Sequence, residues 1–401
     1  MLSYDEAIAR ILSQISPSTP ISLPILESLG LILAENIHTH SPLPPFDNSA
    51  MDGYAVVGAD VASASMGEPV ALTLLGTIAA GGDIAVRVTP GYAAPIMTGA
   101  PMPPGADTVV PVEDTKRMGD GVWVLEAATP GQFVRKAGED APAGTLVVEN
   151  GSAVRPAEVG MFAAAGRQSV LAHRRPRVGV ISTGDELAEP GADLGPAQIY
   201  NSNSYAIAAQ VMEAGGDVAV RVHARDTLED LRAAFDACVD CDVILTTGGV
   251  SVGEFDFVKA VIEERGSVDF WRVAIRPGKP FVFGQCGGAL LFGLPGNPVS
   301  AMVTFELFVR PALRRLLGAA NPMRPMETAL LTEEVSHDPG RRDFQRAVVT
   351  EGAAGLRVRP TGRQGSGMLR SMVLANALMI VPEDVPSLAA GEPISVIRLS
   401  S

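Results

Sequence analysis

Three stretches decide the fold of this chain: Val178-Gly-Val-Ile-Ser-Thr-Gly-Asp-Glu-Leu187, Asp242-Val-Ile-Leu-Thr-Thr-Gly-Gly-Val-Ser-Val-Gly253 and Ala289-Leu-Leu-Phe-Gly-Leu-Pro-Gly-Asn-Pro298. Each is an apolar run that ends in glycine and small polar residues, which is typical of a buried strand followed by a loop. Helical patterns alternate with these strands, and this order predicts a doubly wound, mainly parallel α/β sheet. Loops in such a sheet meet at its carboxyl edge, where backbone N–H groups and helix N-termini bind anions. We therefore predict a phosphate-handling site at this edge.

Composition excludes several other classes of protein. The chain has 401 residues, 47% of them hydrophobic and 19% charged, which predicts a globular protein with several cores. Its 31 Lys+Arg against 45 Asp+Glu give a net charge of -14, which argues against a nucleic-acid partner. Three cysteines provide no disulfide framework and favour a reducing compartment, and we expect the Cys238-x-x-Cys241 pair to be inert.

Neither the N-terminus nor the longest uncharged segment is predicted to enter a membrane. The N-terminus is acidic and leads into an amphipathic helix from about Tyr4, unlike a secretory signal, so we expect a cytoplasmic protein. The uncharged segment from Pro280 to Phe305 is interrupted by Pro295-Gly-Asn-Pro298, which argues against a membrane helix. No membrane partner is expected.

Changes in residue pattern predict four domains. Residues 46–141 alternate in short runs punctuated by Gly and Pro, which predicts an inserted β domain. The flanking segments, 1–45 and 142–175, would then pack together, with a short helix at about Leu23 to Leu29. Residues 176–322 form the α/β domain, and residues 323–401 read as a C-terminal β-barrel or sandwich.

Known phosphate-binding fingerprints are missing from the sequence. Neither G-x-G-x-x-G after a strand nor G-x-x-x-x-G-K-[ST] occurs, which argues against a dinucleotide dehydrogenase and a P-loop NTPase. The prediction rests on loops such as Thr246-Thr-Gly-Gly249-Val-Ser251, where glycine admits a close anion and hydroxyls donate to it. Taken alone, this loop could equally be an ordinary strand-to-helix turn.

Carboxylates accompany these loops. Glu186 follows the first strand, and Asp226 and Asp256 stand where helices begin, so a hard divalent cation could bridge them to phosphate. N-capping is the alternative, above all for Asp226, which with Glu229 would form a capping box. Asn297 is predicted to cap the helix that starts at Pro298.

Polar motifs outside the α/β domain are ambiguous when read residue by residue. Phe46 to Tyr54, Ile96 to Pro101 and Gly138-Glu-Asp140 are rich in turn-forming and polar residues, and hairpin turns would explain them equally well. In the last domain, Arg346 and Gly362-Arg-Gln-Gly-Ser366 could grip phosphate or carboxylate, with local ion pairing as the alternative.

Together these motifs resemble the molybdopterin molybdenumtransferases, the MoeA-like family that includes the E domain of gephyrin. They occur in the order of the family and extend over nearly the whole chain. The matching strings are Phe46-Asp-Asn-Ser-Ala-Met-Asp-Gly-Tyr-Ala-Val56, Met97-Thr-Gly-Ala-Pro101, Gly138-Glu-Asp140, Ser182-Thr-Gly-Asp-Glu-Leu187, Gly248-Gly-Val-Ser-Val-Gly253, Pro277-Gly-Lys-Pro280, Gly293-Leu-Pro-Gly-Asn-Pro-Val-Ser300, Asp343-Phe-Gln-Arg346 and Gly365-Ser366.

The resemblance implies a fold, a reaction and partners. It implies a homodimer of elongated four-domain subunits, in which 1–45 with 142–175 is a linker and dimerisation domain and 176–322 binds molybdopterin. It implies insertion of molybdate into adenylylated molybdopterin, with Mg²⁺ or another divalent cation, releasing AMP and the molybdenum cofactor. A molybdopterin adenylyltransferase is the implied protein partner.

The same resemblance assigns roles to residues of this chain. Residues implied as catalytic are Asp52, Thr98, Asp140, Glu186, Asp226 and Asp256, of which Glu186, Asp226 and Asp256 would hold the metal. Residues implied in binding cofactor or anions are Thr183, Gly184, Gly248, Gly249, Ser251, Arg272, Arg276, Lys279, Pro295, Asn297, Arg346 and Ser366. Because these groups belong to different domains, the site is expected to close across the dimer.

One departure and two alternatives accompany this reading. Some relatives carry lysine where this chain has Arg272 and Arg276, which keeps the charge and changes the geometry of the molybdate contact. The first alternative keeps the α/β domain and makes the protein a nucleotide pyrophosphatase, against which the inserted and C-terminal β domains speak. The second is a non-catalytic scaffold, for which the sequence shows no added linker or partner-binding tail.

Overall fold

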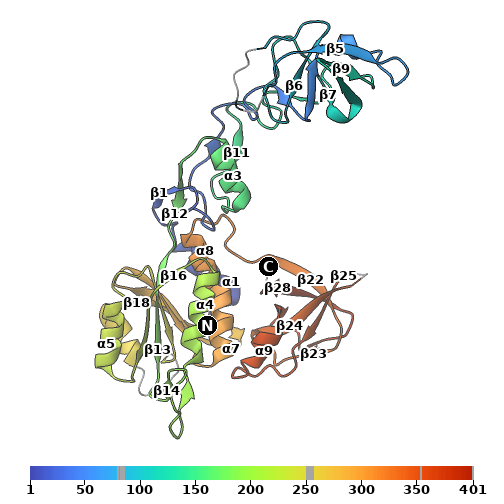
Figure 1. Cartoon of the computed structure of the whole chain (residues 1–401). Coiled ribbons are helices and arrows are strands. Elements are labelled where there is room, and N and C mark those ends of the chain that lie inside the picture. The colour runs from blue at the N-terminus through green and yellow to red at the C-terminus, as the bar shows by residue number, and fades with distance from the viewer. Residues whose placement is uncertain (79–80, 82–85, 250–256, 353–354, 400–401) are drawn as a thin grey trace.

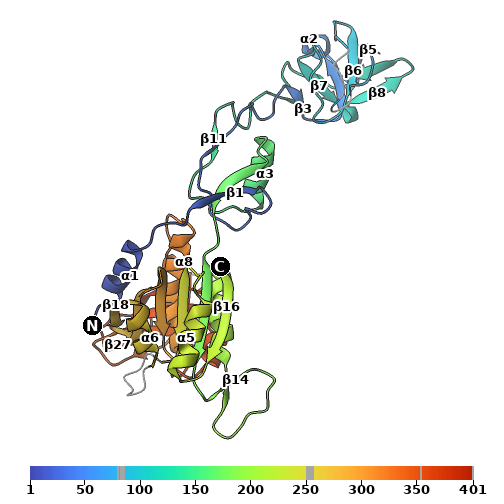
Figure 2. The same ribbon diagram turned by 90° about the vertical axis from the view of Figure 1, so that its left-hand side faces the viewer.

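The chain forms an elongated molecule with domains at both ends of a narrow middle (Figure 1). This computed structural model describes residues 1–78, 81, 86–249, 257–352 and 355–399. Figures 1 and 2 show a small β domain at the upper end, while the α/β domain and a second β domain lie side by side at the lower end. This arrangement confirms the predicted fold class of an α/β domain combined with β domains. The predicted domain boundaries stay a prediction.

The α/β domain is built on a six-stranded sheet of order β16-β13-β17-β21-β20-β18. The first four strands are parallel, and β20 and β18 continue the sheet in antiparallel fashion. Strands β17 and β21 are buried along their whole length, as expected for a sheet covered on both faces. The strands are β13 (Arg177–Thr183), β16 (Asp217–Ala224), β17 (Val243–Thr247), β18 (Gly266–Arg272), β20 (Pro280–Cys286) and β21 (Ala289–Leu294).

Helices cover both faces of this sheet, with α5 on one side and α4 and α7 on the other (Figure 1). Each fully buried Leu, Ile or Phe side chain in these two layers stabilises the fold by about 1.5–3 kcal/mol. The N-terminal helix α1, capped by Ser3 and Glu6, packs into the same core as α4 and α7. The helices are α1 (Tyr4–Ser13), α4 (Ser202–Glu213), α5 (Leu228–Ala237), α6 (Phe257–Arg265), α7 (Pro298–Thr304), a π-helical turn η2 (Phe305–Val309) and α8 (Arg310–Leu316).

The C-terminal domain is a closed five-stranded barrel. Its strands follow the order β24-β25-β22-β28-β26, and β26 pairs with β24 to close the ring. A sixth strand, β19 (Ile275–Arg276), comes from the α/β domain and pairs in parallel with β24, so that Arg276 lies opposite Asp343. The elements are β22 (Met326–Leu331), β23 (Val335–Ser336), β24 (Arg342–Gly352), β25 (Gly355–Pro360), α9 (Arg370–Leu374), β26 (Ala377–Val381), β27 (Ser387–Leu388) and β28 (Pro393–Arg398).

The inserted β domain contains a six-stranded sheet of order β7-β4-β6-β5-β9-β8. Small aliphatic side chains fill its two cores, one on each side of β4 and β6. Its elements are β4 (Gly53–Val56), α2 (Gly58–Val61), β5 (Val70–Leu74), β6 (Tyr92–Ile96), β7 (Thr108–Pro111), the 3-10 turn η1 (Val112–Asp114), β8 (Thr115–Met118) and β9 (Gly121–Val124).

The narrow middle consists of outgoing and returning chain segments that pair as ribbons (Figure 2). The predicted helix at about Leu23 to Leu29 is wrong, because Pro20–Pro24 forms a strand that pairs with Ser169–His173 and turns follow it. The elements of the middle are β1 (Pro20–Pro24), β2 (Ile37–His38), β11 (Leu146–Val148), α3 (Pro156–Ala164) and β12 (Ser169–His173). Strands β3 (Asn48–Ser49) and β10 (Val134–Arg135) pair with each other at the base of the inserted β domain.

Candidate active site

The predicted phosphate loops meet at one edge of the α/β sheet. The parallel pairings place the last residues of β13, β16, β17 and β21 side by side, since Thr183 pairs with Ala224 and Thr247 pairs with Leu294. This edge lies at the lower end of the molecule, where the loop with β14 (Leu187–Ala188) leaves the sheet (Figure 1). The backbone N–H of Gly248 donates to the Leu294 carbonyl at 3.2 Å, which joins two of the loops directly.

Two glycines at this edge have backbone angles that favour glycine. Gly184 has φ +141°, and a side-chain carbon there would lie 2.5 Å from Oε2 of Glu186. Gly248 has φ +92°, and a side-chain carbon there would lie 2.9 Å from the Thr183 carbonyl oxygen. Larger residues adopt such backbone angles rarely, so glycine at both positions allows the Glu186 carboxylate and the second loop to approach β13.

Carboxylates crowd together next to these loops. The Asp226 backbone N–H donates to Oδ1 of Asp185 at 3.2 Å. Burial, followed by the nearby negative charges of Asp185 and Glu186, raises the pKa of the Asp226 carboxyl above its ordinary value. The predicted capping role of Asp226 is wrong, because the Thr227 hydroxyl caps α5 by accepting from the Asp230 N–H. The Asp226 carboxylate is thereby left for another role.

The carboxylates at this edge have the chemistry that a divalent cation requires. Carboxylate oxygens are the donors that Mg²⁺ and similar hard cations take, and mutual repulsion between Asp226 and its acidic neighbours is what a cation relieves. Of the predicted ligands, Asp256 lies outside the described residues, as does Ser251. Within the part of the chain that the structure describes, no three His, Cys, Asp or Glu side chains are grouped to hold a metal.

A cavity of about 90 Å³ opens beside the loops and is lined in part by residues that sequence reasoning missed. Asn203, in the first turn of α4, lines it and donates from Nδ2 to the Gly296 carbonyl at 2.7 Å. Asn201 caps α4 and is buried, with Nδ2 donating to the Ser182 hydroxyl at 2.9 Å. The available signal was the run of amide and hydroxyl residues from Tyr200 to Tyr205, just before an apolar helix.

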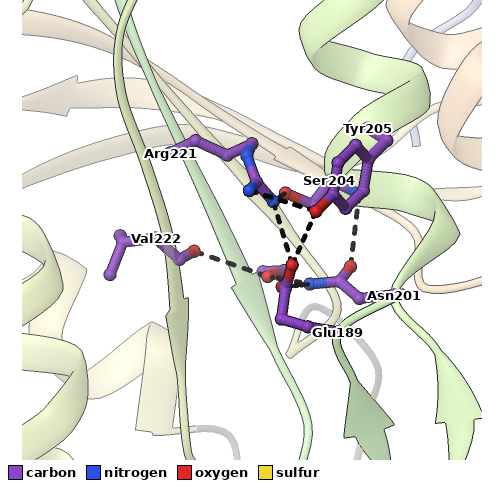
Figure 3. A network of polar contacts seen from close by, with 7 residues as sticks. Glu189, Asn201, Ser204, Tyr205, Arg221 and Val222 are labelled. Atoms are coloured by element: carbon purple, nitrogen blue, oxygen red, sulfur yellow. Dashed lines mark hydrogen bonds and ion pairs between the residues drawn. The ribbon is translucent and has the colours of Figure 1, made fainter. Parts of the chain in front are cut away.

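A polar network holds the protruding loop that carries Glu186 (Figure 3). Glu189 accepts a hydrogen bond from the Tyr205 hydroxyl at 2.7 Å, and this bond is the main cause of its lowered pKa. Arg221 stacks 4.1 Å from the centre of the Tyr205 ring and pairs with Glu189 at 3.6 Å. Strands β14 and β15 (Ile199–Tyr200) of this loop pair in parallel, so the loop returns to α4 in a fixed register.

A second anion pocket was predicted around Arg346 and Ser366, and the structure joins it to the sheet edge. Asn297 stands at the N-cap position of α7, but its amide Nδ2 donates to the Ser366 hydroxyl at 3.1 Å instead of capping the helix. Arg346 is fully buried and donates to the Ser371 hydroxyl and the Gly365 carbonyl, both at 3.1 Å. Burial lowers the pKa of Arg346 to about 10, so it stays charged near neutral pH.

The predicted basic residues are divided between two places. Arg272 and Lys279 line one open depression of about 460 Å³ beside Trp271. Arg276 lines another cavity, next to the C-terminal barrel, and forms an ion pair of 3.0 Å with the exposed Asp338. Pro295 is buried at the end of β21, where it orients the loop that carries Asn297.

Residues predicted from the inserted β domain form a separate group. Asp52 Oδ1 accepts hydrogen bonds from the Thr98 backbone N–H at 2.7 Å and the Thr98 hydroxyl at 2.8 Å, which hold the pKa of Asp52 below its ordinary value. Asp140 lies where the chain leaves this domain, with its N–H donating to the Leu43 carbonyl. Figure 1 shows this domain at the opposite end from β14, so one subunit does not bring the two groups together.

Family models match the chain in three consecutive parts. Residues 2–166 match the MoeA N-terminal region (domain I and II), residues 179–315 match a probable molybdopterin binding domain, and residues 328–399 match the MoeA C-terminal region (domain IV). The anion-binding edge described above lies in the second part. Fold and site together define a protein of molybdenum cofactor biosynthesis.

Relatives across the full length make the assignment specific. The chain is 43% identical to molybdopterin molybdenumtransferase 2 of Mycobacterium tuberculosis over 94% of both chains. It is 36% identical to the molybdopterin molybdenumtransferase of Haemophilus influenzae, covering 99% of this chain and 98% of the relative. A crystal structure of the molybdopterin biosynthesis moeA protein from Pyrococcus horikoshii superposes with a TM-score of 0.83, 35% identity and full coverage of both chains. The chain belongs to the MoeA family of molybdopterin molybdenumtransferases.

Proposed function

We propose that this enzyme takes adenylylated molybdopterin and molybdate as substrates and releases AMP and the molybdenum cofactor. As a molybdopterin molybdenumtransferase, it inserts molybdenum into molybdopterin. The adenylylated form of the substrate, the release of AMP and the use of Mg²⁺ or another divalent cation are our proposals. In the overall reaction, water cleaves the phosphoanhydride to give AMP, and the two dithiolene sulfurs displace oxygen ligands of molybdate, which leave as water.

The observation that carries this proposal is the meeting of three anion-binding loops with carboxylates at one sheet edge. The N–H groups around Gly248 and Gly249, together with Thr183, would bind the phosphates. Glu186 and Asp226, with Asp256, would hold the cation, which would neutralise charge on the phosphoanhydride. Glu186 and Asp226 are exposed enough to reach a bound ligand.

Basic side chains would attract the oxyanion. Burial is the main cause of the lowered pKa of Arg346; Asp343 opposes this shift and Arg276 adds to it, so a bound anion would stabilise the charged guanidinium of Arg346. The loop from Gly362 to Ser366 connects Arg346 to Asn297 at the sheet edge. We therefore place molybdate between Arg346, Ser366 and the sheet edge, with Arg272 and Lys279 attracting it from the neighbouring surface.

A second subunit would complete the site. Asp52, Thr98 and Asp140 stand at the far end of an elongated subunit, and an antiparallel two-fold dimer would bring this end to the opposite end of the partner subunit. We propose a homodimer in which these residues reach the sheet edge of the partner subunit. We also propose that the enzyme works in the cytoplasm and receives its substrate from a molybdopterin adenylyltransferase. In the described residues, no helix has the length and apolar character needed to cross a membrane.

The reaction and the shared site are tested together by AMP release. Purified enzyme with adenylylated molybdopterin, molybdate and magnesium should release AMP and yield cofactor that activates a molybdoenzyme lacking it. Subunits carrying Asp52→Ala should be inactive alone, and so should subunits carrying Glu186→Gln. A one-to-one mixture that exchanges subunits should regain about one quarter of the wild-type activity, because half the dimers are mixed and each mixed dimer has one intact site.

Other outcomes identify the alternatives. No regained activity in the mixture would show that both residues act within one subunit or that the dimer differs. AMP release that ignores molybdate, together with hydrolysis of ADP-ribose, would indicate a nucleotide pyrophosphatase. Absence of AMP from the wild-type enzyme with the fold intact would favour a scaffold.

A further inference from the structure

The protruding loop with β14 and β15 leaves the sheet after β13 and returns to α4 (Figure 1). At the base of this loop, the Ile199 N–H donates to the Glu186 carbonyl at 2.9 Å. Two residues further along each limb, the Asn201 N–H donates to the Ala188 carbonyl, also at 2.9 Å. The Glu186 backbone is therefore bonded to the returning limb, and the position of the loop base decides where the Glu186 carboxylate lies.

A polar network attaches the loop to α4 and to β16 (Figure 3). The Tyr205 hydroxyl of α4 donates to the Glu189 carboxylate of the loop at 2.7 Å. The same hydroxyl accepts from the Arg221 guanidinium of β16 at 3.3 Å, and this guanidinium lies 3.6 Å from the Glu189 carboxylate. Tyr205 therefore contacts both charged groups and joins three segments of the chain.

The two charged groups belong to the segments that carry the proposed cation ligands. Glu189 follows Glu186 by three residues within the loop. Arg221 precedes Asp226 by five residues, and Asp226 comes just after the end of β16. A connection between Glu189 and Arg221 therefore restricts the separation of the Glu186 and Asp226 carboxylates, which the cation would bridge.

The network opposes a repulsion at the sheet edge. The negative charges of two acidic neighbours act on the Asp226 carboxylate, and this repulsion drives the loop away from β16 until a cation binds. Attraction between Glu189 and Arg221 acts in the opposite direction, but solvent screens an ion pair whose side chains are this exposed. The Tyr205 hydroxyl adds a charge-assisted hydrogen bond to the same carboxylate, which is the stronger contact.

We propose that Tyr205 is a positioning residue for the transfer reaction, which holds Glu186 beside Asp226 through Glu189 and Arg221. The inference rests on the proposed cation site and adds to it a residue that contacts neither the cation nor the substrate. Two ligands held in place before the cation arrives lose less conformational freedom when it binds, and supporting contacts change metal affinity by about 10–100-fold. Because Tyr205 and its partners are partly exposed, we expect the low end of this range, about tenfold.

Cation binding to the full-length protein provides the first test. Mn²⁺ takes the same oxygen ligands as Mg²⁺ and is followed by EPR as it is titrated into the wild type, Tyr205→Phe and Tyr92→Phe. Tyr92 is a matched control because it is exposed to a similar extent, 40% against 43%, and lies in the inserted β domain. We expect Tyr205→Phe to bind Mn²⁺ about tenfold more weakly and Tyr92→Phe to match the wild type. Equal affinity in all three proteins overturns the proposal.

Hydrogen exchange at the loop base reports on the position of Glu186 in the absence of a cation. The Ile199 and Asn201 amides exchange when the loop base opens, because both donate to carbonyls of the outgoing limb. Without Mn²⁺, we expect both amides to exchange about tenfold faster in Tyr205→Phe than in the wild type, and saturating Mn²⁺ should restore their protection. Unchanged exchange, or exchange that stays fast at saturating Mn²⁺, overturns the proposal.

Kinetics separate positioning from a general loss of structure. Tyr205→Phe should need about tenfold more Mg²⁺ for half-maximal AMP release and should reach nearly the wild-type rate at saturating Mg²⁺. A structural defect would lower the rate at every Mg²⁺ concentration, and that result overturns the proposal. If Tyr205→Phe does not fold, Glu189→Gln decides the matter, because it removes the charge that Tyr205 and Arg221 bind and should raise the Mg²⁺ requirement in the same way.

The same measurements distinguish this inference from the proposed function. A wild type that binds Mn²⁺ with the expected difference from Tyr205→Phe, but releases no AMP, would reject the proposed reaction and leave the role of Tyr205 standing. A wild type that releases AMP but binds Mn²⁺ no more tightly than Tyr205→Phe would overturn the role of Tyr205 alone. A wild type that binds no Mn²⁺ would overturn both the cation site and the positioning role.

Discussion

Replacing Gly184 by alanine tests whether Glu186 must be held at the sheet edge for activity. The added carbon would lie 2.5 Å from Oε2 of Glu186, whereas ordinary contact begins near 3.4 Å, so the carboxylate has to move by about 1 Å. A displacement of about 1 Å in a reacting or metal-binding group costs roughly 10²-fold in rate. The positive φ of +141° adds backbone strain of about 1–3 kcal/mol to the free energy of folding.

Gly191→Ala is the matched control for this change. Gly191 lies in the same protruding loop with φ +95°, and nothing stands within 4 Å of the position that its side chain would take. Both variants should lose stability in chemical denaturation by similar amounts, about 1–3 kcal/mol. AMP release should fall about 10²-fold in Gly184→Ala and stay near the wild-type rate in Gly191→Ala.

A double variant tests whether Gly184→Ala acts through the Glu186 carboxylate. If Gly184→Ala acts through Glu186, adding it to Glu186→Ala should lower AMP release little further, because both changes remove one interaction. Independent, multiplied losses in the double variant would refute this link. Wild-type activity of a folded Gly184→Ala enzyme would refute the role of Glu186 itself.

Three further predictions follow from single contacts. Thr98→Val should raise the pKa of Asp52 toward its ordinary value, and an NMR titration of the carboxyl group would measure this change. Because the pKa of Asp52 is lowered in the folded protein, the contact stabilises the fold at neutral pH, and this stabilisation disappears as the pH falls through that pKa. Asn297→Ala should cost about 0.5–1.5 kcal/mol in denaturation by removing the hydrogen bond to Ser366, and should raise the KM for molybdate; an unchanged KM would contradict the proposed anion pocket. Burial raises the pKa of Cys238 to about 12, so the native protein should resist a thiol reagent at pH 8 and react once unfolded, whereas rapid labelling of native protein would contradict its inert role.

Local sequence patterns predicted many elements correctly. The amphipathic helix predicted from about Tyr4 is observed as α1 (Tyr4–Ser13), because an amphipathic pattern reports the face that a helix buries. The prediction failed around Leu23, since β1 is a strand only through its pairing with β12, far along the chain. Pairing of that kind leaves little local signal.

The helix-capping roles of Asp226 and Asn297 could not be assigned correctly from the sequence alone. Asp226 and Thr227 are both good N-cap residues, and the structure gives the cap to Thr227 while Asp226 lies next to Asp185 and Glu186. Asn297 has the sequence position of a cap, yet its amide bonds Ser366 of another domain. In both cases the competing partner comes from a distant segment, so only the folded chain could decide the outcome.

The sequence by itself determined that three glycine-containing loops would share one edge, because parallel strands joined by right-handed crossovers end at the same side of a sheet. Tertiary structure alone decided how the other groups are distributed. It placed Arg276 against Asp343 next to the C-terminal barrel, separated Arg276 from Arg272 and Lys279, and held the inserted domain at the far end of the subunit. The reason is physical: strand direction follows from local pattern and chain connectivity, whereas these placements depend on pairing between segments distant in sequence, whose partners no local pattern specifies.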